Sequence, residues 1–149
     1  GAFSAQVAER ICGVVMKDGS LDEVATGAAR AAIRQRRLAW SADKTLASRP
    51  EAAGTEPVAI VGDVARIVRA SGTPYLVCNS CDTAIAPAAE NWKDYARHNL
   101  ATPEDLGPRV RIHHDLEVVQ HACPHCATLL DVEVRRKGEA SLFDIQVAA

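Results

Sequence analysis

Four of the five cysteines in this chain share one spacing. Cys78 and Cys81 form one Cys-x-x-Cys pair, Cys123 and Cys126 form a second, and Cys12 stands alone. A Cys-x-x-Cys pair on a tight turn points two sulfurs at one ion, and two pairs complete the tetrahedral thiolate set of structural zinc sites. An odd number of cysteines also fits poorly with a disulfide framework. We therefore expect one structural Zn²⁺ per chain, held by the four paired cysteines.

The spacing between the pairs and the sequence after the second pair favour a zinc ribbon. The 41 residues between the pairs (82–122) exceed the roughly 15–20 of the commonest zinc pattern. Such an insert costs little, because closure entropy rises only with the logarithm of loop length. Directly after the second pair, apolar and polar residues alternate through Thr128–Arg135, which indicates a strand. Turns that carry cysteines between strands are typical of a zinc ribbon.

The second motif also supports a redox alternative. Cys-Pro-His-Cys is the active-site tetrapeptide of thioredoxin-fold disulfide oxidases, where a helix N-terminus lowers the pKa of the first thiol. That chemistry requires a helix directly after the motif, whereas a strand is predicted here, so a thiol oxidoreductase is the less favoured alternative. His121 and His125 flank the pair, but four thiolates leave no vacancy. We expect both imidazoles to lie outside the ligand set.

The remaining candidate residues do not form a catalytic constellation. Cys12 is adjacent to the apolar face of the helix predicted over residues 5–16, which predicts a small, partly buried side chain. His113 and Asp115 could bind a second metal or relay protons if they share a face. Neighbouring strand residues point to opposite faces, so His113 and His114 are not expected to share a ligand, and polar residues near a turn are the favoured interpretation. His98 is expected to be a helix-end cation. With no P-loop, G-x-S-x-G or H-E-x-x-H motif, we expect no catalytic residues.

Composition excludes several classes of protein. The 149 residues carry a formal charge of −2 and are 48% hydrophobic, whereas dedicated nucleic-acid binders are usually strongly basic. A freestanding zinc ribbon that binds nucleic acid remains an alternative, but its only basic patch near the ribbon, residues 135–137, contains no aromatic residue for stacking. No apolar run approaches the ~20 residues that span a bilayer, and no secretory leader pattern opens the chain. We expect a cytoplasmic protein that binds neither membranes nor nucleic acid.

Apolar periodicity predicts an α+β fold in which an N-terminal helical arm precedes a β-rich, zinc-ribbon-like module. Residues 5–16 and 21–37 show helical spacing, with Ser20 and Glu23 as a capping box. Arg34, Arg36 and Arg37 fall in the last turn, where cations complement the helix dipole. A solvated helix end is the favoured interpretation, and binding of a phosphate or an acidic partner is the alternative. The helices form an arm over residues 1–40 that is expected to dock on a partner.

Small, polar and proline-interrupted residues predict a linker over 41–57, and the zinc-binding β-rich domain occupies 58–149. Within this domain we expect a helix over 88–98 and a loop over 101–108. Besides the strand after the second cysteine pair, the sequence predicts strands over 58–61, 64–68, 75–78, 110–112, 116–119 and 142–147.

Three segments of the module resemble the small zinc-binding subunit of the acetone and acetophenone carboxylase family. They are residues 75–81 (Tyr-Leu-Val-Cys-Asn-Ser-Cys), 89–96 (Ala-Glu-Asn-Trp-Lys-Asp-Tyr-Ala) and 121–134 (His-Ala-Cys-Pro-His-Cys-Ala-Thr-Leu-Leu-Asp-Val-Glu-Val). The resemblance extends over about residues 57–148. One departure from many zinc ribbons is that Asp82 and Ala127 stand where glycine commonly follows the second cysteine.

The resemblance implies a function in a cytoplasmic hetero-oligomer. Enzymes of this family use ATP to activate a ketone and bicarbonate and join them into a β-keto acid. Their larger subunits, related to hydantoinases and oxoprolinases, carry the ATP sites and the carboxylation chemistry. The chain is therefore expected to be the non-catalytic, structural zinc-binding subunit of such a ligase. Only Cys78, Cys81, Cys123 and Cys126 carry over as individual site residues.

Overall fold

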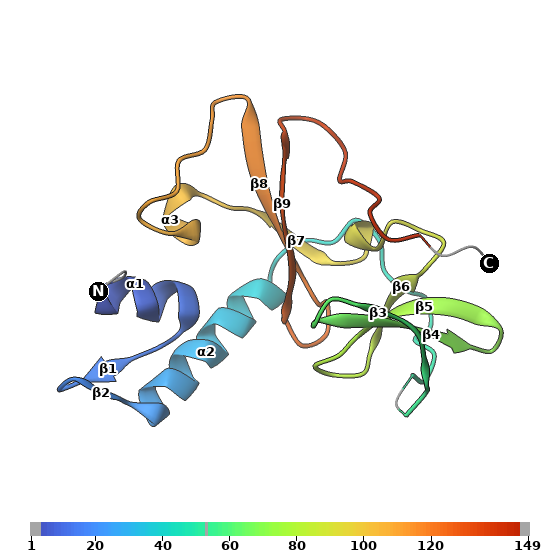
Figure 1. The fold of residues 1–149 in the computed structure, drawn as a ribbon, viewed down its shortest axis with the longest axis horizontal. Coiled ribbons are helices and arrows are strands. Elements are labelled where there is room, and N and C mark those ends of the chain that lie inside the picture. The colour runs from blue at the N-terminus through green and yellow to red at the C-terminus, as the bar shows by residue number, and fades with distance from the viewer. Residues whose placement is uncertain (1–3, 53, 147–149) are drawn as a thin grey trace.

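A computed structural model describes residues 4–52 and 54–146 and confirms the α+β class (Figure 1). Its described residues contain a helical N-terminal arm, a four-stranded antiparallel sheet in the order β3-β4-β5-β6 and a three-stranded antiparallel sheet in the order β7-β8-β9. The strands are β3 (Pro57–Val61), β4 (Ala65–Ala70), β5 (Thr73–Cys78), β6 (Ala84–Pro87), β7 (Arg97–Leu100), β8 (Leu116–Ala122) and β9 (Leu129–Arg136).

The arm begins with a short helix and a hairpin. Helix α1 (Ala5–Val7) continues as the π-helical turn η1 (Ala8–Cys12) and ends at Gly13, where φ is +62°, so the first helix is shorter than predicted. Strands β1 (Met16–Lys17) and β2 (Ser20–Leu21) then pair around Asp18 and Gly19. Both turn residues have positive φ, as a type I′ hairpin turn requires.

Helix α2 (Glu23–Leu38) confirms the second predicted helix but begins differently. The predicted capping box is wrong, because Ser20 pairs with Lys17 in the hairpin and Asp22 takes the N-cap position. The Asp22 carboxylate accepts a hydrogen bond from the Ala25 amide at 2.9 Å, as N-cap residues do. Among the described residues, no helix combines the length and apolarity needed to cross a bilayer.

The four-stranded sheet is a simple meander, and its strands β3, β4 and β5 confirm the predictions over 58–61, 64–68 and 75–78. Strand β5 is an inner strand that pairs with both β4 and β6. Most of its residues are buried. Apolar side chains from these strands form most of the core: Ile67, Val68, Leu76, Val77 and Ile85 are each at most 2% exposed. This sheet presents the first cysteine pair at the end of β5.

The three-stranded sheet forms partly from residues predicted to be helical. The helix expected over 88–98 is wrong: Trp92–Asp94 make a single 3₁₀ turn, η2, capped by the Asn91 side chain. Residues 97–100 then pair with the long strand β8, because tertiary pairing overrides a weak local preference. The predictions over 116–119 and 128–135 correspond to β8 and β9.

Three further predictions in the C-terminal half are wrong. The loop expected over 101–108 contains a short helix, α3 (Pro103–Leu106), and residues 110–112 form no strand. No strand forms over 142–146 either, and residue 147 lies outside the described residues. The tail bonds to side chains instead: the Leu142 amide donates to Glu133 at 2.7 Å, and the Asp144 carboxylate accepts from the Trp92 indole at 3.0 Å.

Candidate metal centre

The first Cys-x-x-Cys pair lies on a tight turn between β5 and β6, which we call the first knuckle (residues 78–83). The Asp82 amide donates to the Cys78 carbonyl at 2.9 Å, and the Cys78 amide donates to the Thr83 carbonyl at 3.1 Å. Asp82 has a φ of +55°, in the left-handed region that glycine usually occupies. Its carboxylate also pairs with Arg66 at 2.7 Å, so the aspartate ties the knuckle to β4.

The second pair lies on a turn with the same backbone pattern between β8 and β9, the second knuckle (residues 123–128). The Ala127 amide donates to the Cys123 carbonyl at 3.0 Å, and the Cys123 amide donates to the Thr128 carbonyl at 2.8 Å. Ala127 has a φ of +61°, and its carbonyl accepts a hydrogen bond from Arg37 of α2 at 3.3 Å. The departure from glycine noted in the sequence therefore changes the residue type but not the backbone conformation.

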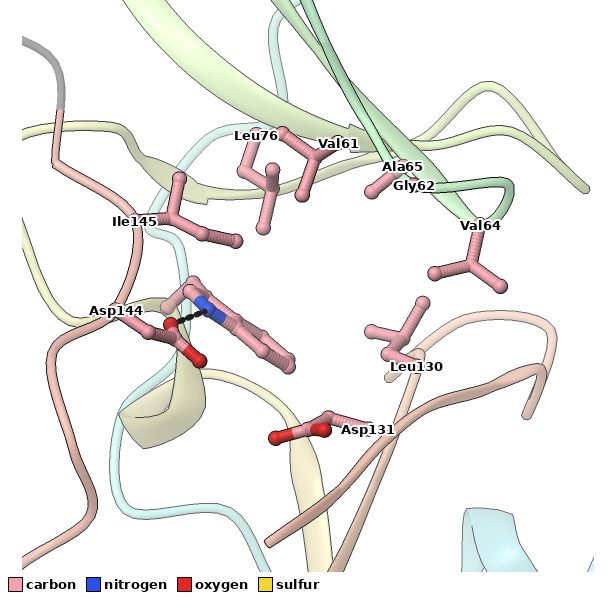
Figure 2. Close-up of a pocket in the computed structure, with 10 residues that line it drawn as sticks. Val61, Gly62, Val64, Ala65, Leu76, Leu130, Asp131, Asp144 and Ile145 are labelled. Carbon is pink, nitrogen blue, oxygen red and sulfur yellow. Dashed lines mark hydrogen bonds between the residues drawn. The ribbon is translucent and has the colours of Figure 1, made fainter.

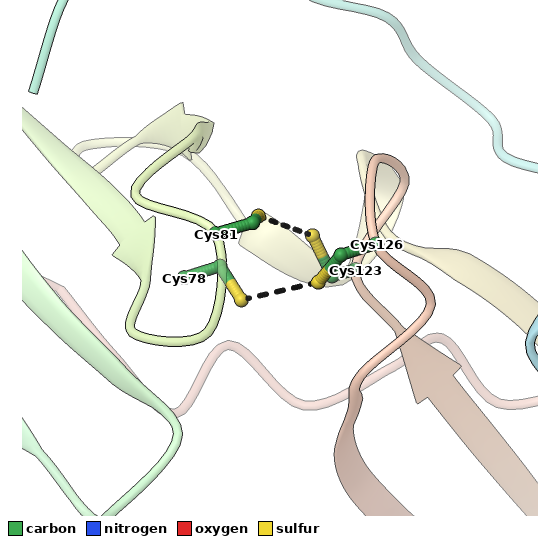
Figure 3. A group of neighbouring side chains, drawn as sticks. All are labelled: Cys78, Cys81, Cys123 and Cys126. Carbon is green, nitrogen blue, oxygen red and sulfur yellow. Dashed lines mark hydrogen bonds between the residues drawn. The ribbon is translucent and has the colours of Figure 1, made fainter. Parts of the chain in front are cut away.

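The two knuckles face each other and bring all four sulfurs together (Figure 3). The Sγ atoms of Cys78 and Cys126 lie 3.7 Å apart, those of Cys81 and Cys123 lie 3.8 Å apart, and all four lie within 4.8 Å of one another. Four sulfurs about 2.3 Å from a central ion form a tetrahedron with edges of about 3.8 Å, whereas disulfide sulfurs lie about 2.05 Å apart. The four free thiols could therefore bind one metal ion.

Hydrogen bonds within the cluster favour a thiolate. The pKa of Cys78 is lowered to about 5, chiefly because the Cys123 thiol hydrogen-bonds to it. The same hydrogen bond and burial raise the pKa of Cys123, and burial raises the pKa of Cys81. The thiolate is the form that binds metals, so Cys78 is favoured in the metal-binding form. A bound ion would displace the protons of the other thiols.

The strand that follows the second knuckle weighs against the redox alternative. Residues Leu129–Arg136 form β9, so the motif is followed by a strand and not by the helix whose N-terminus activates the first thiol of a thioredoxin-fold oxidase. The patch proposed for nucleic-acid binding is also weakened, because Arg135 is paired with Glu117 at 2.7 Å.

The structure separates the two histidines that flank the second pair. His121 is 1% exposed, packs edge to face on Trp92 with ring centroids 5.7 Å apart, and places Nε2 3.4 Å from Glu133. Burial lowers the pKa of His121. His125 is exposed and lies 3.1 Å from Arg49.

His113, His114 and Asp115 are polar residues at the turn before β8, as the favoured interpretation predicts, whereas the predictions for Cys12 and His98 are wrong. His113 and His114 do gather, with ring centroids 4.2 Å apart and with Asp115 3.6 and 3.3 Å away, because they lie before β8 rather than on a strand. All three are exposed. Cys12 is exposed rather than partly buried. His98 lies on β7 near Asp43, at 3.9 Å, and not at a helix end.

A buried charge network around Lys93, beside the knuckles, was not predicted from the sequence. Lys93 is 3% exposed, and its Nζ lies 2.9 Å from Asp144, 3.1 Å from Asp131 and 3.5 Å from Glu133. Burial alone would lower the pKa of Lys93, but the carboxylates of Asp144 and Asp131 raise it overall. The alternating acids of β9 were a signal for a charged face, but the sequence did not show that Lys93 meets them. The network fastens the C-terminal tail and η2 to the second sheet.

An apolar cavity of about 350 Å³ lies between the four-stranded sheet and the C-terminal tail (Figure 2). Val61, Leu76 and Ile145 line its upper part, and Leu130 lies opposite. Its acids, Asp131 and Asp144, are already engaged by Lys93. The cavity therefore presents no free nucleophile or acid–base pair.

Comparison with known families assigns the two-knuckle region. The model of the family described as acetone carboxylase gamma subunit matches residues 55–148, which include both knuckles and both larger sheets, while comparison with curated proteins gives no match. The match covers more than half of the chain and agrees with the resemblance carried by the cysteine pairs and their flanks. The chain belongs to the acetone carboxylase gamma subunit family.

Proposed function

We propose that this chain is the structural zinc-binding subunit of an ATP-dependent ketone carboxylase that converts a ketone and bicarbonate into a β-keto acid. Membership in a gamma subunit family implies that the chain is part of a multisubunit acetone carboxylase. The observation that carries the proposal is the four-thiol cluster, whose 3.7 and 3.8 Å sulfur separations fit one tetrahedral ion.

Zinc is the proposed ion because of the donor set. Tetrahedral sites of four sulfurs are characteristic of zinc or iron–sulfur centres, and two knuckles that supply four cysteines are the usual structural zinc arrangement. Cys78, Cys81, Cys123 and Cys126 would use all four coordination positions. A site closed in this way stabilises a fold and offers no position for substrate, which supports a structural purpose.

The charged residues outside the cluster support a non-catalytic subunit. Lys93, Glu133 and His121 are buried and engaged with one another or with neighbouring acids. The apolar cavity offers no reactive group. We therefore assign ATP binding and carboxylation to larger hydantoinase- and oxoprolinase-like subunits, with which this chain would form a cytoplasmic hetero-oligomer.

The exposed apolar residues of the arm support a docking function for residues 1–40. Val24 on α2 is 86% exposed, and Leu21 and Met16 of the hairpin are about half exposed. Such side chains gain from burial against a partner, by about 25 cal/mol per Å² of apolar surface. We propose that the arm contacts a larger subunit, that residues 41–57 link it, and that residues 58–149 form the zinc-binding domain.

Purification of the native complex tests this proposal. The tagged full-length chain should retain larger subunits, and the complex should carboxylate a ketone with ATP. The chain alone should neither hydrolyse ATP nor carboxylate a ketone. A matched variant with Val24→Glu should reduce retention without loss of the cysteine-bound metal. ATPase activity in the isolated chain, or a native chain that purifies without larger subunits, would contradict the assignment.

A further inference from the structure

A cavity of about 290 Å³ lies between the arm and the three-stranded sheet, apart from the cysteine cluster. Arg10 of η1 and Arg36 and Arg37 of α2 line one side together with Trp40, and Gln120 of β8 lies among the residues of the other side. The arm lies before the family-matched residues 55–148. The cavity is therefore formed jointly by the arm and the two-knuckle region.

The charge of this cavity is unbalanced. Three arginines line it, against one aspartate, Asp105, which leaves two positive charges in excess. The Asp105 carboxylate is already engaged, because it accepts hydrogen bonds from the amide and the hydroxyl of Thr102 at 2.9 and 3.0 Å. Among the residues that the structure describes, Arg36 and Arg37 form no salt bridge, whereas Arg10 is close enough to the exposed Glu104 carboxylate to help lower its pKa. An anion would complete the site.

The arginines of α2 are held close together without an acid between them. Arg36 and Arg37 are adjacent in the last turn of the helix, and burial together with the charge of Arg36 lowers the pKa of Arg37. One Arg37 nitrogen donates to the Ala127 carbonyl, but a guanidinium has five donors, so others remain. Paired guanidinium groups are well suited to phosphate oxygens.

We propose that this cavity binds a small organic phosphate monoester, with the phosphate on the guanidinium groups of Arg36 and Arg37 and a flat ring against Trp40. A phosphate monoester carries a charge of about −1.5 to −2 at neutral pH, which matches the excess positive charge. The half-buried Trp40 side chain lines the same cavity, and aromatic rings gain energy by offset or edge contacts. The volume lies near the lower end of small-molecule sites, about 300 Å³, which favours a small ligand.

Calorimetric titration of the metal-loaded full-length chain tests this proposal with phenyl phosphate, inorganic phosphate and phenol as probes. Phenyl phosphate should bind at least about tenfold more tightly than either fragment, because only it uses both the arginines and the ring face. Arg36→Gln should weaken phenyl phosphate binding about tenfold or more. Arg34→Gln is the matched control, since Arg34 lies on the same helix, is exposed and does not line the cavity.

Two further variants separate the parts of the site. Trp40→Leu should remove the preference for phenyl phosphate over inorganic phosphate, and Arg10→Gln should weaken both, with thermal unfolding showing that each variant remains folded. The proposal is overturned if phenyl phosphate does not bind, or if Arg34→Gln and Arg36→Gln weaken binding equally. Loss of larger subunits from Arg36→Gln without any phenyl phosphate binding by the parent chain would also overturn it, and would assign the arginines to an acidic protein surface.

Discussion

The N-terminal arm and the two-knuckle region are held together by different means. Thr26 is the only buried residue of α2, and its hydroxyl fixes the arm by accepting a hydrogen bond from the Val15 amide at 3.0 Å. The two-knuckle region instead buries a continuous apolar core and joins its two sheets through the sulfur cluster. Damage to the arm should therefore remain local, whereas damage to the cysteines should spread through both sheets.

The largest effect is expected from removal of one cysteine ligand. Cys123→Ser should lose the metal and the cooperative folding of both sheets, because structural zinc contributes on the order of 10 kcal/mol to folding. Circular dichroism and hydrogen exchange on the fresh protein would measure the loss. Cys12→Ser is the matched control, since Cys12 is exposed and outside the cluster. Equal stability of the two variants would remove the distinction between the regions.

Loss of the buried cation should have the next largest effect. Lys93→Met leaves Asp131, Glu133 and Asp144 without their shared partner, and breaking a buried ion pair costs about 3–5 kcal/mol. Chemical denaturation should show this loss as a lower midpoint. Lys44→Met is the matched control: Lys44 is exposed and pairs with Glu90 and Asp94 at the surface, and its loss should lower the midpoint far less, because exposed ion pairs contribute little to stability. A similar small cost for both would contradict the importance assigned to the network.

A change in the arm should destabilise the arm alone. A Cβ on Gly13 would meet Arg30 Cγ at 2.8 Å at a φ of +62°, so Gly13→Ala should separate η1 from α2 at a cost of about 2 kcal/mol. Hydrogen exchange should accelerate over residues 4–40 but not in β5 or β8. Gly27→Ala is the control, because its Cβ would meet open space in α2, and it should stabilise the helix by about 0.5–1 kcal/mol. Faster exchange in the sheets of Gly13→Ala would show that the regions are coupled.

The smallest effect is expected when the residue with positive φ in each knuckle is replaced by glycine. Ala127→Gly relieves a left-handed conformation that costs an L-residue about 1–2 kcal/mol, but glycine loses about 0.5–1 kcal/mol through its greater freedom when unfolded. We expect a net gain of about 0.5 kcal/mol in thermal unfolding. Asp82→Gly should gain less, because it also loses the contact with Arg66. A clear loss of stability in Ala127→Gly would show that its methyl group, which is fully buried, contributes more than its strain costs.

Local patterns predicted the parts of the fold that depend on local sequence. Alternation after the second cysteine pair predicted β9, and helical spacing predicted α2. Residues 97–100 could not be predicted as a strand, because β7 exists through its pairing with β8, about 20 residues further along the chain. The choice of Asp22 over Ser20 as N-cap likewise depended on the hairpin that takes Ser20 into β2.

The cysteine cluster could be predicted because its spacing carries the information, whereas the charge network could not. Two Cys-x-x-Cys pairs imply one site whatever the length between them. Lys93 meets its acids only because η2, β9 and the C-terminal tail converge. The left-handed conformation of Asp82 and Ala127 was signalled only by their position, where glycine is common in zinc ribbons, because alanine itself gives no sign of positive φ.

The most direct test of the central claim is the metal content of the fresh full-length chain, combined with X-ray absorption at the metal edge. The proposal predicts about one zinc per chain, with four sulfur neighbours at about 2.3 Å. Well under one equivalent of metal, nitrogen or oxygen neighbours in place of sulfur, or disulfides within the two pairs would contradict it.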